Sequence, residues 1–341
     1  MRRTGMTGWI GRAMLVAVLG LTPAVAVRAG VRPAQGGGDA AALIAARAHF
    51  EAGQYEQARV VLTAAVAAQP DDATLYHWLS RTYLALGDDD RAIDFAKQAV
   101  ERAPQRAEFH RWLGRAYGDK ADRTRSFWLA RKVKGEFEKA VELDPRDVAA
   151  RRDLMEFYLD APWIVGGGQD KARDQLSAIA ALDPVQGDLA RATYLLSDGR
   201  TDQAAEAYRR ALAAQPASAD PYFEAAAFYL RHRDRAALAD AVAGAARVAP
   251  DDARLGFYRG VTAVIDGRAD HAAERALLAY LAAPPPGDDA PSPASAHLWL
   301  GRLYEQDGRV PEAVEQYRRV LALVPDQRAA RAALDRLQSA R

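Results

Sequence analysis

The sequence of 341 residues contains no cysteine. Without a thiol, the chain can form no disulfide, no thiolate metal site and no cysteine nucleophile, and it has no cysteine to carry a lipid. The folded chain must therefore be stabilised by packing and by polar contacts alone.

Aromatic residues are scarce, at 8% of the chain, and the β-branched or aromatic runs that are typical of strands hardly occur. Half of the residues are hydrophobic, with alanine the most frequent of them. Alanine, leucine, arginine and glutamate all favour helix. The composition therefore predicts an all-α protein.

The chain also lacks a large excess of charge of either sign, with 46 Lys and Arg against 45 Asp and Glu. Four of the arginines lie within residues 1–29, which contain no acidic residue, so the remainder has 42 basic and 45 acidic side chains. Nucleic-acid binders carry a basic excess or a basic patch. We therefore expect no nucleic-acid partner.

Long apolar runs are missing except for residues 13–27, a stretch of fifteen residues that contains Pro23. The run follows a basic segment and precedes small residues, with cleavage plausible after Ala26 or Ala29, which is the layout of a secretory signal peptide. A spanning helix needs about 20 residues, although a retained N-terminal anchor remains the alternative. We expect residues 1–29 to be a signal peptide and, because the composition suggests a GC-rich bacterial genome, a periplasmic protein with no stable membrane span after cleavage.

Patterns of catalytic and metal-binding residues are absent as well. None of the six histidines has a partner at metal-ligand spacing, and no Gly-x-Ser-x-Gly motif occurs. Three glycines at 166–168 precede a predicted helix, but neither a preceding strand nor a following Lys-Ser/Thr completes a phosphate loop. The sequence therefore predicts no enzymatic activity, no cofactor and no bound metal.

What the sequence does contain is a repeat with a modal period of 34 residues, in which proline follows each helical run. Five glycines are each followed five residues later by alanine, and each of those alanines precedes a proline by twelve residues: Gly53, Gly87, Gly199, Gly267 and Gly308. Glycine can end the first helix of a unit in the left-handed conformation, and proline prevents the second helix from continuing. Each unit is therefore predicted to be one helical hairpin.

Segments such as Gly53–Ala58 and Phe137–Pro145 resemble the tetratricopeptide repeat family, and the resemblance covers residues 39–341. It implies an all-α, right-handed superhelical solenoid of about eight helical hairpins plus a C-terminal capping helix. The predicted parts are a flexible linker at 30–38, hairpins at about 39–72, 73–106, 107–147, 148–184, 185–218, 219–252, 253–286 and 294–327, and a cap at 328–341. The family shares a scaffold rather than a chemistry.

Two hairpins carry insertions. The third has seven extra residues, with Phe127 and Trp128 among them, and the fourth has five extra residues that include Trp163 and Ile164. Such aromatic tips could contact a partner. The favoured interpretation is that they pack on the neighbouring hairpin or anchor the loop.

In the family's architecture the first helix of each hairpin lines a concave groove. Residues that share one helical stripe, spaced i, i+4 and i+7, are predicted to point into it. This predicts a groove that is basic in its N-terminal half and apolar in hairpins six and seven, and the final hairpin adds Leu298, Arg302 and Glu305. The predicted partner-binding residues are Arg47, His77, Arg81, Arg111, Arg115, Arg152, Phe223, Phe257 and Val261.

Three tryptophans, Trp78, Trp112 and Trp299, share one slot beside this stripe. They could form an aromatic shelf along the groove. The favoured interpretation is that they fill the space between adjacent first helices.

Arginine is suited to bidentate capture of carboxylates, and solvent-facing apolar residues in a concave surface mark interaction sites. The sequence therefore predicts a non-catalytic scaffold of the cell envelope that binds an acidic and apolar segment of a protein partner. The alternatives are a structural subunit of an envelope export or polysaccharide-secretion complex, and the binding of a small ligand or glycan. The arginines could also be paired with nearby Glu and Asp in solvent.

Overall fold

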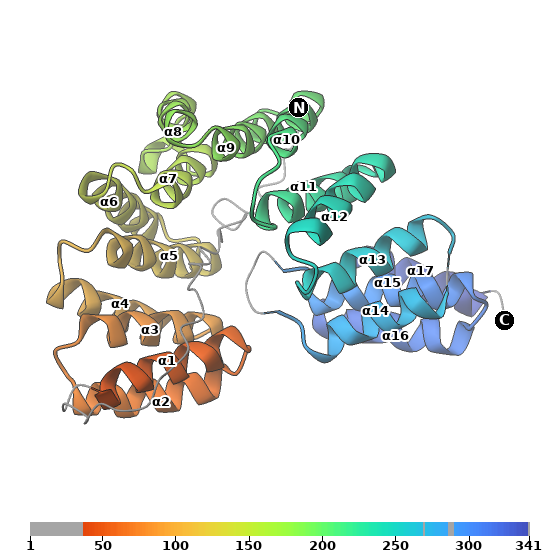
Figure 1. The fold of residues 1–341 in the computed structure, drawn as a ribbon, viewed down its shortest axis with the longest axis horizontal. Helices are drawn as coiled ribbons and strands as arrows, with labels where there is room; N and C mark the ends of the chain where they lie inside the picture. The colour runs from red at the N-terminus through yellow and green to blue at the C-terminus, as the bar shows by residue number, and fades with distance from the viewer. Residues whose placement is uncertain (1–36, 269, 286–289, 340–341) are drawn as a thin grey trace, which may run out of the picture. The chain divides into compact units, whose positions relative to one another are not determined.

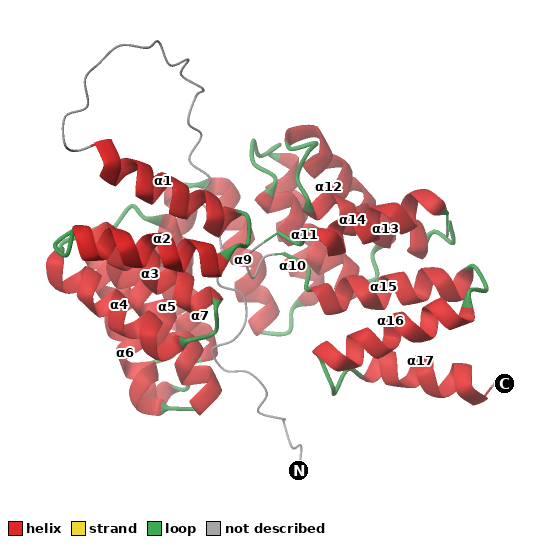
Figure 2. Cartoon of the chain, turned by 90° about the horizontal axis from the view of Figure 1, so that it is seen from below, coloured by secondary structure: helices red, strands yellow, loops and turns green. Residues whose placement is uncertain are grey.

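The computed structural model describes residues 37–268, 270–285 and 290–339. The predicted signal peptide and most of the predicted linker lie outside these residues. The described residues form helices joined by short loops, without any strand (Figure 2). The all-α repeat fold predicted from the sequence is thereby confirmed. Within the same residues, no helix is long and apolar enough to cross a bilayer.

The helices follow one another in the order that the repeat predicts (Figure 1). The chain divides into two compact units, with the division between Ala207 and Tyr208, inside α10. The first unit begins with α1 (Gly37–Glu51), α2 (Tyr55–Ala68), α3 (Ala73–Ala85), α4 (Asp89–Arg102), α5 (Ala107–Thr124), α6 (Phe127–Leu143), α7 (Val148–Asp160), the 3-10 turn η1 (Trp163–Val165), α8 (Gln169–Leu182) and α9 (Pro184–Ser197).

The boundary helix is α10 (Thr201–Ala213), and the second unit continues with α11 (Asp220–His232), α12 (Arg235–Val248), α13 (Arg254–Ile265), α14 (His271–Ala282), α15 (Pro293–Gln306), α16 (Val310–Leu323) and α17 (Arg328–Ser339). Within the units, hairpins form between α1 and α2, α3 and α4, α5 and α6, α7 and α8, α11 and α12, α13 and α14, and α15 and α16. The last helix, α17, packs on α16 and covers it with Ala330, Ala333 and Leu334.

Local sequence explains where the helices begin and end. Acidic side chains cap the N-termini of many helices; Asp147, for example, accepts hydrogen bonds from the backbone N–H groups of Ala149 and Ala150. The repeated glycine ends the first helix of a hairpin in the left-handed region, with φ of 77° at Gly87 and 72° at Gly308. The predicted reason for glycine at this slot is therefore confirmed.

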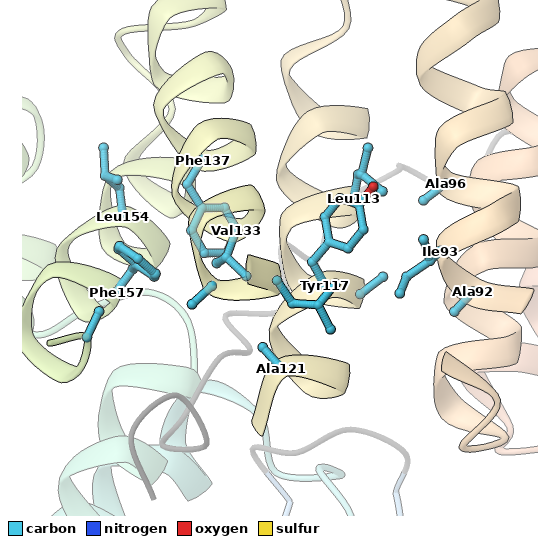
Figure 3. Packing of buried hydrophobic residues seen from close by; sticks show 14 of the residues in the cluster. Ala92, Ile93, Ala96, Leu113, Tyr117, Ala121, Val133, Phe137, Leu154 and Phe157 are labelled. Carbon is cyan, nitrogen blue, oxygen red and sulfur yellow. The ribbon is translucent and has the colours of Figure 1, made fainter. Parts of the chain in front are cut away.

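Small residues on the first helices allow the second helices to approach closely. A Cβ atom added to Gly114 would lie 2.5 Å from Cε1 of Phe137. Figure 3 shows the resulting core, in which Phe137 and Val133 of α6 lie between Tyr117 of α5 and Phe157 of α7. Each hairpin thus buries its own interior and one face against the next hairpin.

The two insertions are accommodated differently. In the third hairpin, α5 has 18 residues and α6 has 17, whereas α3 and α4 of the preceding hairpin have 13 and 14, so the insertion lengthens both helices. In the fourth hairpin the extra residues form η1, which packs against α6 and buries Val165. Gly167 is required there because a Cβ atom would lie 1.8 Å from the carbonyl oxygen of Ala161.

Candidate functional site

The first unit buries a layer of charged side chains on α3, α5 and α7. Arg111, Arg115 and Arg152 are all at most 7% exposed. Arg115 forms a bidentate pair with Asp153 across α5 and α7: its Nε donates to Oδ2 at 2.7 Å and its Nη2 to Oδ1 at 2.8 Å. Burial disfavours the charged guanidinium, but the carboxylate of Asp153 outweighs this effect and raises the pKa of Arg115.

The other two arginines of this layer are also held by the chain itself. Arg111 lies with Nε 3.5 Å from Oδ2 of Asp153 and Nη1 3.7 Å from Oδ2 of Asp147. Arg152 donates from Nη1 to Oε1 of Gln186 at 3.2 Å, and its Nη2 lies 3.9 Å from Oε1 of Glu156.

The interpretation of Arg111 and Arg115 as groove cations that await a partner's carboxylate is therefore wrong. Their pairing with acidic residues was the alternative, but the pairs are buried rather than solvated. The physical reason is that neighbouring first helices pack directly on one another, so the predicted stripe becomes an interface between them.

Arg81 is held between two tryptophans rather than by a carboxylate. Its guanidinium carbon lies 4.1 Å from the ring centroid of Trp78 and 4.3 Å from that of Trp112. Both indoles are nearly buried, so they fill the space between first helices as the favoured interpretation proposed. Burial lowers the pKa of Arg81 to about 10. Arg47, on α1, is exposed and lies 5.2 Å from the ring of Trp78.

His77 is buried in the same layer, at 2% exposure. Its ring stacks on Phe109 with centroids 5.0 Å apart, and its Nε2 lies 3.3 Å from Oε1 of Glu108. Burial lowers the pKa of His77. The ring is therefore a core side chain and is not available in a groove.

In the second unit, the predicted apolar groove residues belong to the core. Phe223 and Phe257 are each 2% exposed and Val261 is fully buried. Phe223 stacks on Tyr258 at 5.5 Å, and Phe257 contacts Tyr280 at 5.6 Å. The prediction that these side chains face solvent is wrong, because Phe223 lies against the next first helix, α13, and Phe257 lies against α14 of its own hairpin.

An open pocket of about 830 Å³ lies within the second unit. Its apolar walls come from the end of α11, the start of α12, the end of α13 and the face of α15: Tyr229, Leu230, Leu238, Val264, Ile265 and Trp299. Its polar rim consists of Arg233, Asp234, Arg235, Arg302, Glu305 and Gln306.

Most of the polar side chains at this pocket are already engaged. Glu305 accepts hydrogen bonds from Tyr317 at 2.9 Å and from Arg336 at 2.6 Å. Arg235 pairs with Asp266 at 2.8 Å. The charges of Glu305 and Arg235 are therefore largely neutralised by neighbouring side chains of the same unit.

Two cations of the pocket have no such partner. Among the described residues, neither Arg233 nor Arg302 forms an ion pair with a carboxylate within 4.0 Å. The guanidinium carbon of Arg302 lies 4.3 Å from the ring centroid of Trp299. Burial lowers the pKa of Arg302, and the positive charge of Arg233 adds to this effect. The pocket thus combines two under-neutralised guanidinium groups with an aromatic and aliphatic wall.

Sequence reasoning found only part of this pocket. The helical stripe placed Arg302 and Glu305 on the inner face, but it missed Arg233. A signal was nevertheless present, because position 233 lies seventeen residues before Pro250, the slot that holds glycine in five other hairpins. Arg233 adopts the same left-handed conformation, with φ of 61°. It therefore lies just after the helix, and the helical periodicity that defines the stripe does not apply to it.

The large apolar side chains of the insertions remain largely exposed, although the backbone of η1 lies against α6. Trp128 is 63% exposed, Trp163 84% and Ile164 53%, and Phe127 is 54% exposed. The favoured interpretation of these four residues as packed or anchoring side chains is therefore wrong. Val165 makes the buried contact of the loop instead.

No group of three or more potential metal ligands occurs in the part of the chain that the structure describes.

Comparison with known proteins agrees with this architecture. Two segments, residues 49–116 and 272–328, match tetratricopeptide repeat models. The fold defines a helical-repeat scaffold of the kind used for protein–protein contacts. These two segments of the chain therefore have the sequence pattern of tetratricopeptide repeats. No curated protein matches it.

Solved structures that resemble the chain include TTC0263, a thermophilic tetratricopeptide repeat protein of Thermus thermophilus. It is 26% identical, the match covers 56% of this chain and 99% of that chain, and the TM-score is 0.47. The APC/C hetero-tetramer Cut9–Hcn1 is 17% identical over 87% of this chain and 55% of that chain, with a TM-score of 0.51. The second likeness supports the fold alone.

Proposed function

We propose that the chain is a non-catalytic scaffold of the cell envelope that holds an acidic and apolar segment of a protein partner in the pocket of its second unit. The observation that carries this proposal is the pair Arg233 and Arg302, which lie in one pocket without a carboxylate partner among the described residues. The repeat scaffold supports protein binding as the class of function, and the two arginines of the pocket support recognition of a carboxylate.

The pocket is suited to a carboxylate that is flanked by apolar side chains. Arginine forms charge-assisted, often bidentate hydrogen bonds with carboxylates, and these are about twice as strong as neutral ones. Contact with Trp299 orients the guanidinium of Arg302 before binding, which reduces the ordering cost of association. Leu230 and Ile265 offer apolar contacts beside it.

The size of the pocket fits the side chains of a short segment rather than a whole domain. Sites of roughly 300–1,000 Å³ enclose small molecules or a few side chains. A partner would therefore insert a short segment, and an acidic residue of that segment would neutralise the two arginines.

The location in the cell envelope is supported only by the signal-peptide pattern of residues 1–29. Fractionation of cells that express the full chain with a C-terminal tag tests it. Recovery of a shortened chain in the periplasmic fraction is expected, and recovery of the uncut chain in the cytosol would contradict it.

The pocket is tested by photo-crosslinking in cells from a crosslinking amino acid placed at Leu230. The wild type is expected to capture a defined protein, and the variant Arg233→Glu/Arg302→Glu is expected to lose it. The matched control is Arg247→Glu/Arg318→Glu, which reverses two exposed charges of the same unit outside the pocket. Equal capture by the pocket variant and the control would place the partner elsewhere.

A further inference from the structure

The tips of the third and fourth hairpins carry the exposed large aromatic side chains of the described part of the chain. Among the large hydrophobic side chains that are exposed there, the aromatic ones are Phe127, Trp128 and Trp163, and all belong to the two insertions. The others, for example Ile44 and Leu323, are aliphatic and lie elsewhere. We call Trp128, Trp163 and Ile164 the tip patch.

The two parts of the tip patch lie on elements that pack together. Trp128 is at the start of α6, and Trp163 and Ile164 lie in η1, which contacts α6. A Cβ atom at Gly166 would lie 2.8 Å from the side chain of Lys134, so the loop lies directly on α6. Both insertions therefore contribute to one edge of the first unit.

The chain segment around Trp128 is basic. Residues 123–135 contain five cations and no acidic residue. Among the described residues, Arg125 and Arg131 are exposed and form no ion pair within 4.0 Å. Lys132 lies with Nζ 4.1 Å from the ring centroid of Trp128. Arg123 pairs with Asp89 and Lys134 pairs with Glu138, so Arg125 and Arg131 are the exposed cations of this stretch that remain for an external anion.

Exposed tryptophan beside arginine and lysine matches the chemistry of a bilayer surface. Tryptophan is enriched at the level of the lipid headgroups, and basic side chains are attracted to anionic lipids. An aliphatic residue such as Ile164 gains from the headgroup–acyl boundary, whereas it adds nothing to the base stacking by which aromatic side chains hold single-stranded nucleic acid. The patch also projects from hairpin tips, where a flat surface can reach it without a groove.

We propose that the tip patch, together with Arg125 and Arg131, docks the first unit onto the surface of an anionic phospholipid bilayer. The site is separate from the pocket of the second unit and does not depend on the partner that the pocket holds. In this arrangement the indole rings and Ile164 lie among the headgroups, and the arginines contact lipid phosphates.

The absence of cysteine from the sequence allows a direct test. The full-length variant Ile164→Cys, labelled with an environment-sensitive fluorophore, is mixed with vesicles of equal parts phosphatidylglycerol and phosphatidylcholine. A blue shift and a rise in fluorescence at this site are expected. The matched control is Leu323→Cys, an exposed aliphatic site of the second unit (55% exposed), at which no change is expected.

Charge is tested in the same labelled chain by Arg125→Gln/Arg131→Gln. Each cation near an anionic surface contributes about fivefold to membrane partitioning, so the double variant should bind roughly 25-fold more weakly. Far-UV circular dichroism is expected to be unchanged, because both arginines are exposed.

Four outcomes would overturn the proposal. The first three are an unchanged fluorophore at position 164, an equal response to vesicles of phosphatidylcholine alone, and an equal response at position 323. The fourth is a response to a single-stranded oligonucleotide without any response to vesicles, which would favour nucleic acid.

Discussion

The guanidinium of Arg115 and the carboxylate of Asp153 form two parallel hydrogen bonds, at 2.7 and 2.8 Å, between α5 and α7. Both side chains are 4% exposed. Arg111 reaches the same carboxylate from the preceding turn of α5, with its Nε 3.5 Å from Oδ2. One carboxylate thus links two arginines across the interface between the third and fourth hairpins.

Removing one partner of this pair should destabilise the first unit strongly. Arg115→Met leaves the charge of Asp153 buried with a single weaker contact, and loss of one partner of a buried pair costs about 3–5 kcal/mol. The urea midpoint of the first unit, followed by circular dichroism, measures the loss. The double variant Arg115→Met/Asp153→Leu should lose less stability than the sum of the two single variants, because it removes both charges and leaves neither one buried without its partner.

A surface pair provides the comparison. Arg319 and Glu315 lie 3.1 Å apart on α16, and both are about half exposed. Arg319→Met should cost less than about 0.5 kcal/mol, as exposed pairs generally do. A similar loss from Arg115→Met and Arg319→Met would show that the buried pair does not hold the hairpins together.

The contact of Arg81 with two indoles predicts a preference for arginine over lysine. A planar guanidinium can lie against both rings, whereas an ammonium group is a compact, strongly hydrated charge. Arg81→Lys should therefore lose about 1–2 kcal/mol of stability. Differential scanning calorimetry provides the measurement, with the exposed Arg318→Lys as control. No difference between the two variants would argue against the cation–π contacts.

The close approach of α5 and α6 predicts opposite effects at two glycines of one hairpin. In Gly114→Ala the new methyl group meets the ring of Phe137, and overpacking of this kind costs about 1–3 kcal/mol. In Gly135→Ala nothing lies within 4 Å of the new atom, so the higher helix propensity of alanine should stabilise the chain by up to about 1 kcal/mol. Thermal unfolding of both variants tests this, and a stabilising Gly114→Ala would contradict the packing.

The lowered pKa of Glu108 leads us to expect that the folded state loses stability as the pH falls into the acid range. Contact with His77 lowers the pKa of Glu108 to about 2 from an ordinary value of 4.5. Because the folded chain holds this carboxylate charged more strongly than the unfolded chain does, its contribution is fully present above about pH 4.5 and is lost as the pH falls toward 2. The advantage of the wild type over Glu108→Gln in urea midpoint should therefore shrink over this window. A constant difference from pH 6 to pH 2 would rule out the contribution.

The repeat and its turns were predictable because they depend on residues that are close in the chain. Gly87 ends a helix through its own backbone conformation, and Asp147 caps one by accepting hydrogen bonds from N–H groups two and three residues later. The spacing also placed seven extra residues in the third hairpin. Arg302 could be placed on an inner face, since helical periodicity alone fixes which residues share a stripe.

The environment of that stripe could not be predicted in the same way. Phe223, Arg115 and Arg302 lie on the same predicted stripe of their hairpins, yet the first two are buried and the third lines a pocket. Their exposure depends on how closely the neighbouring first helix approaches and on what it carries there, such as Asp153 opposite Arg115. Neither quantity is encoded in the spacing within one hairpin.

Residues close together in the chain were enough to predict a series of helical hairpins, because helix caps and turns arise from contacts within about one turn or one hairpin. They could not show which charges are paired inside, which aromatic side chains remain exposed at Trp128 and Trp163, or where two arginines share a pocket. These properties arise from the packing of one hairpin on the next, which brings together residues that are about one repeat or more apart in the chain.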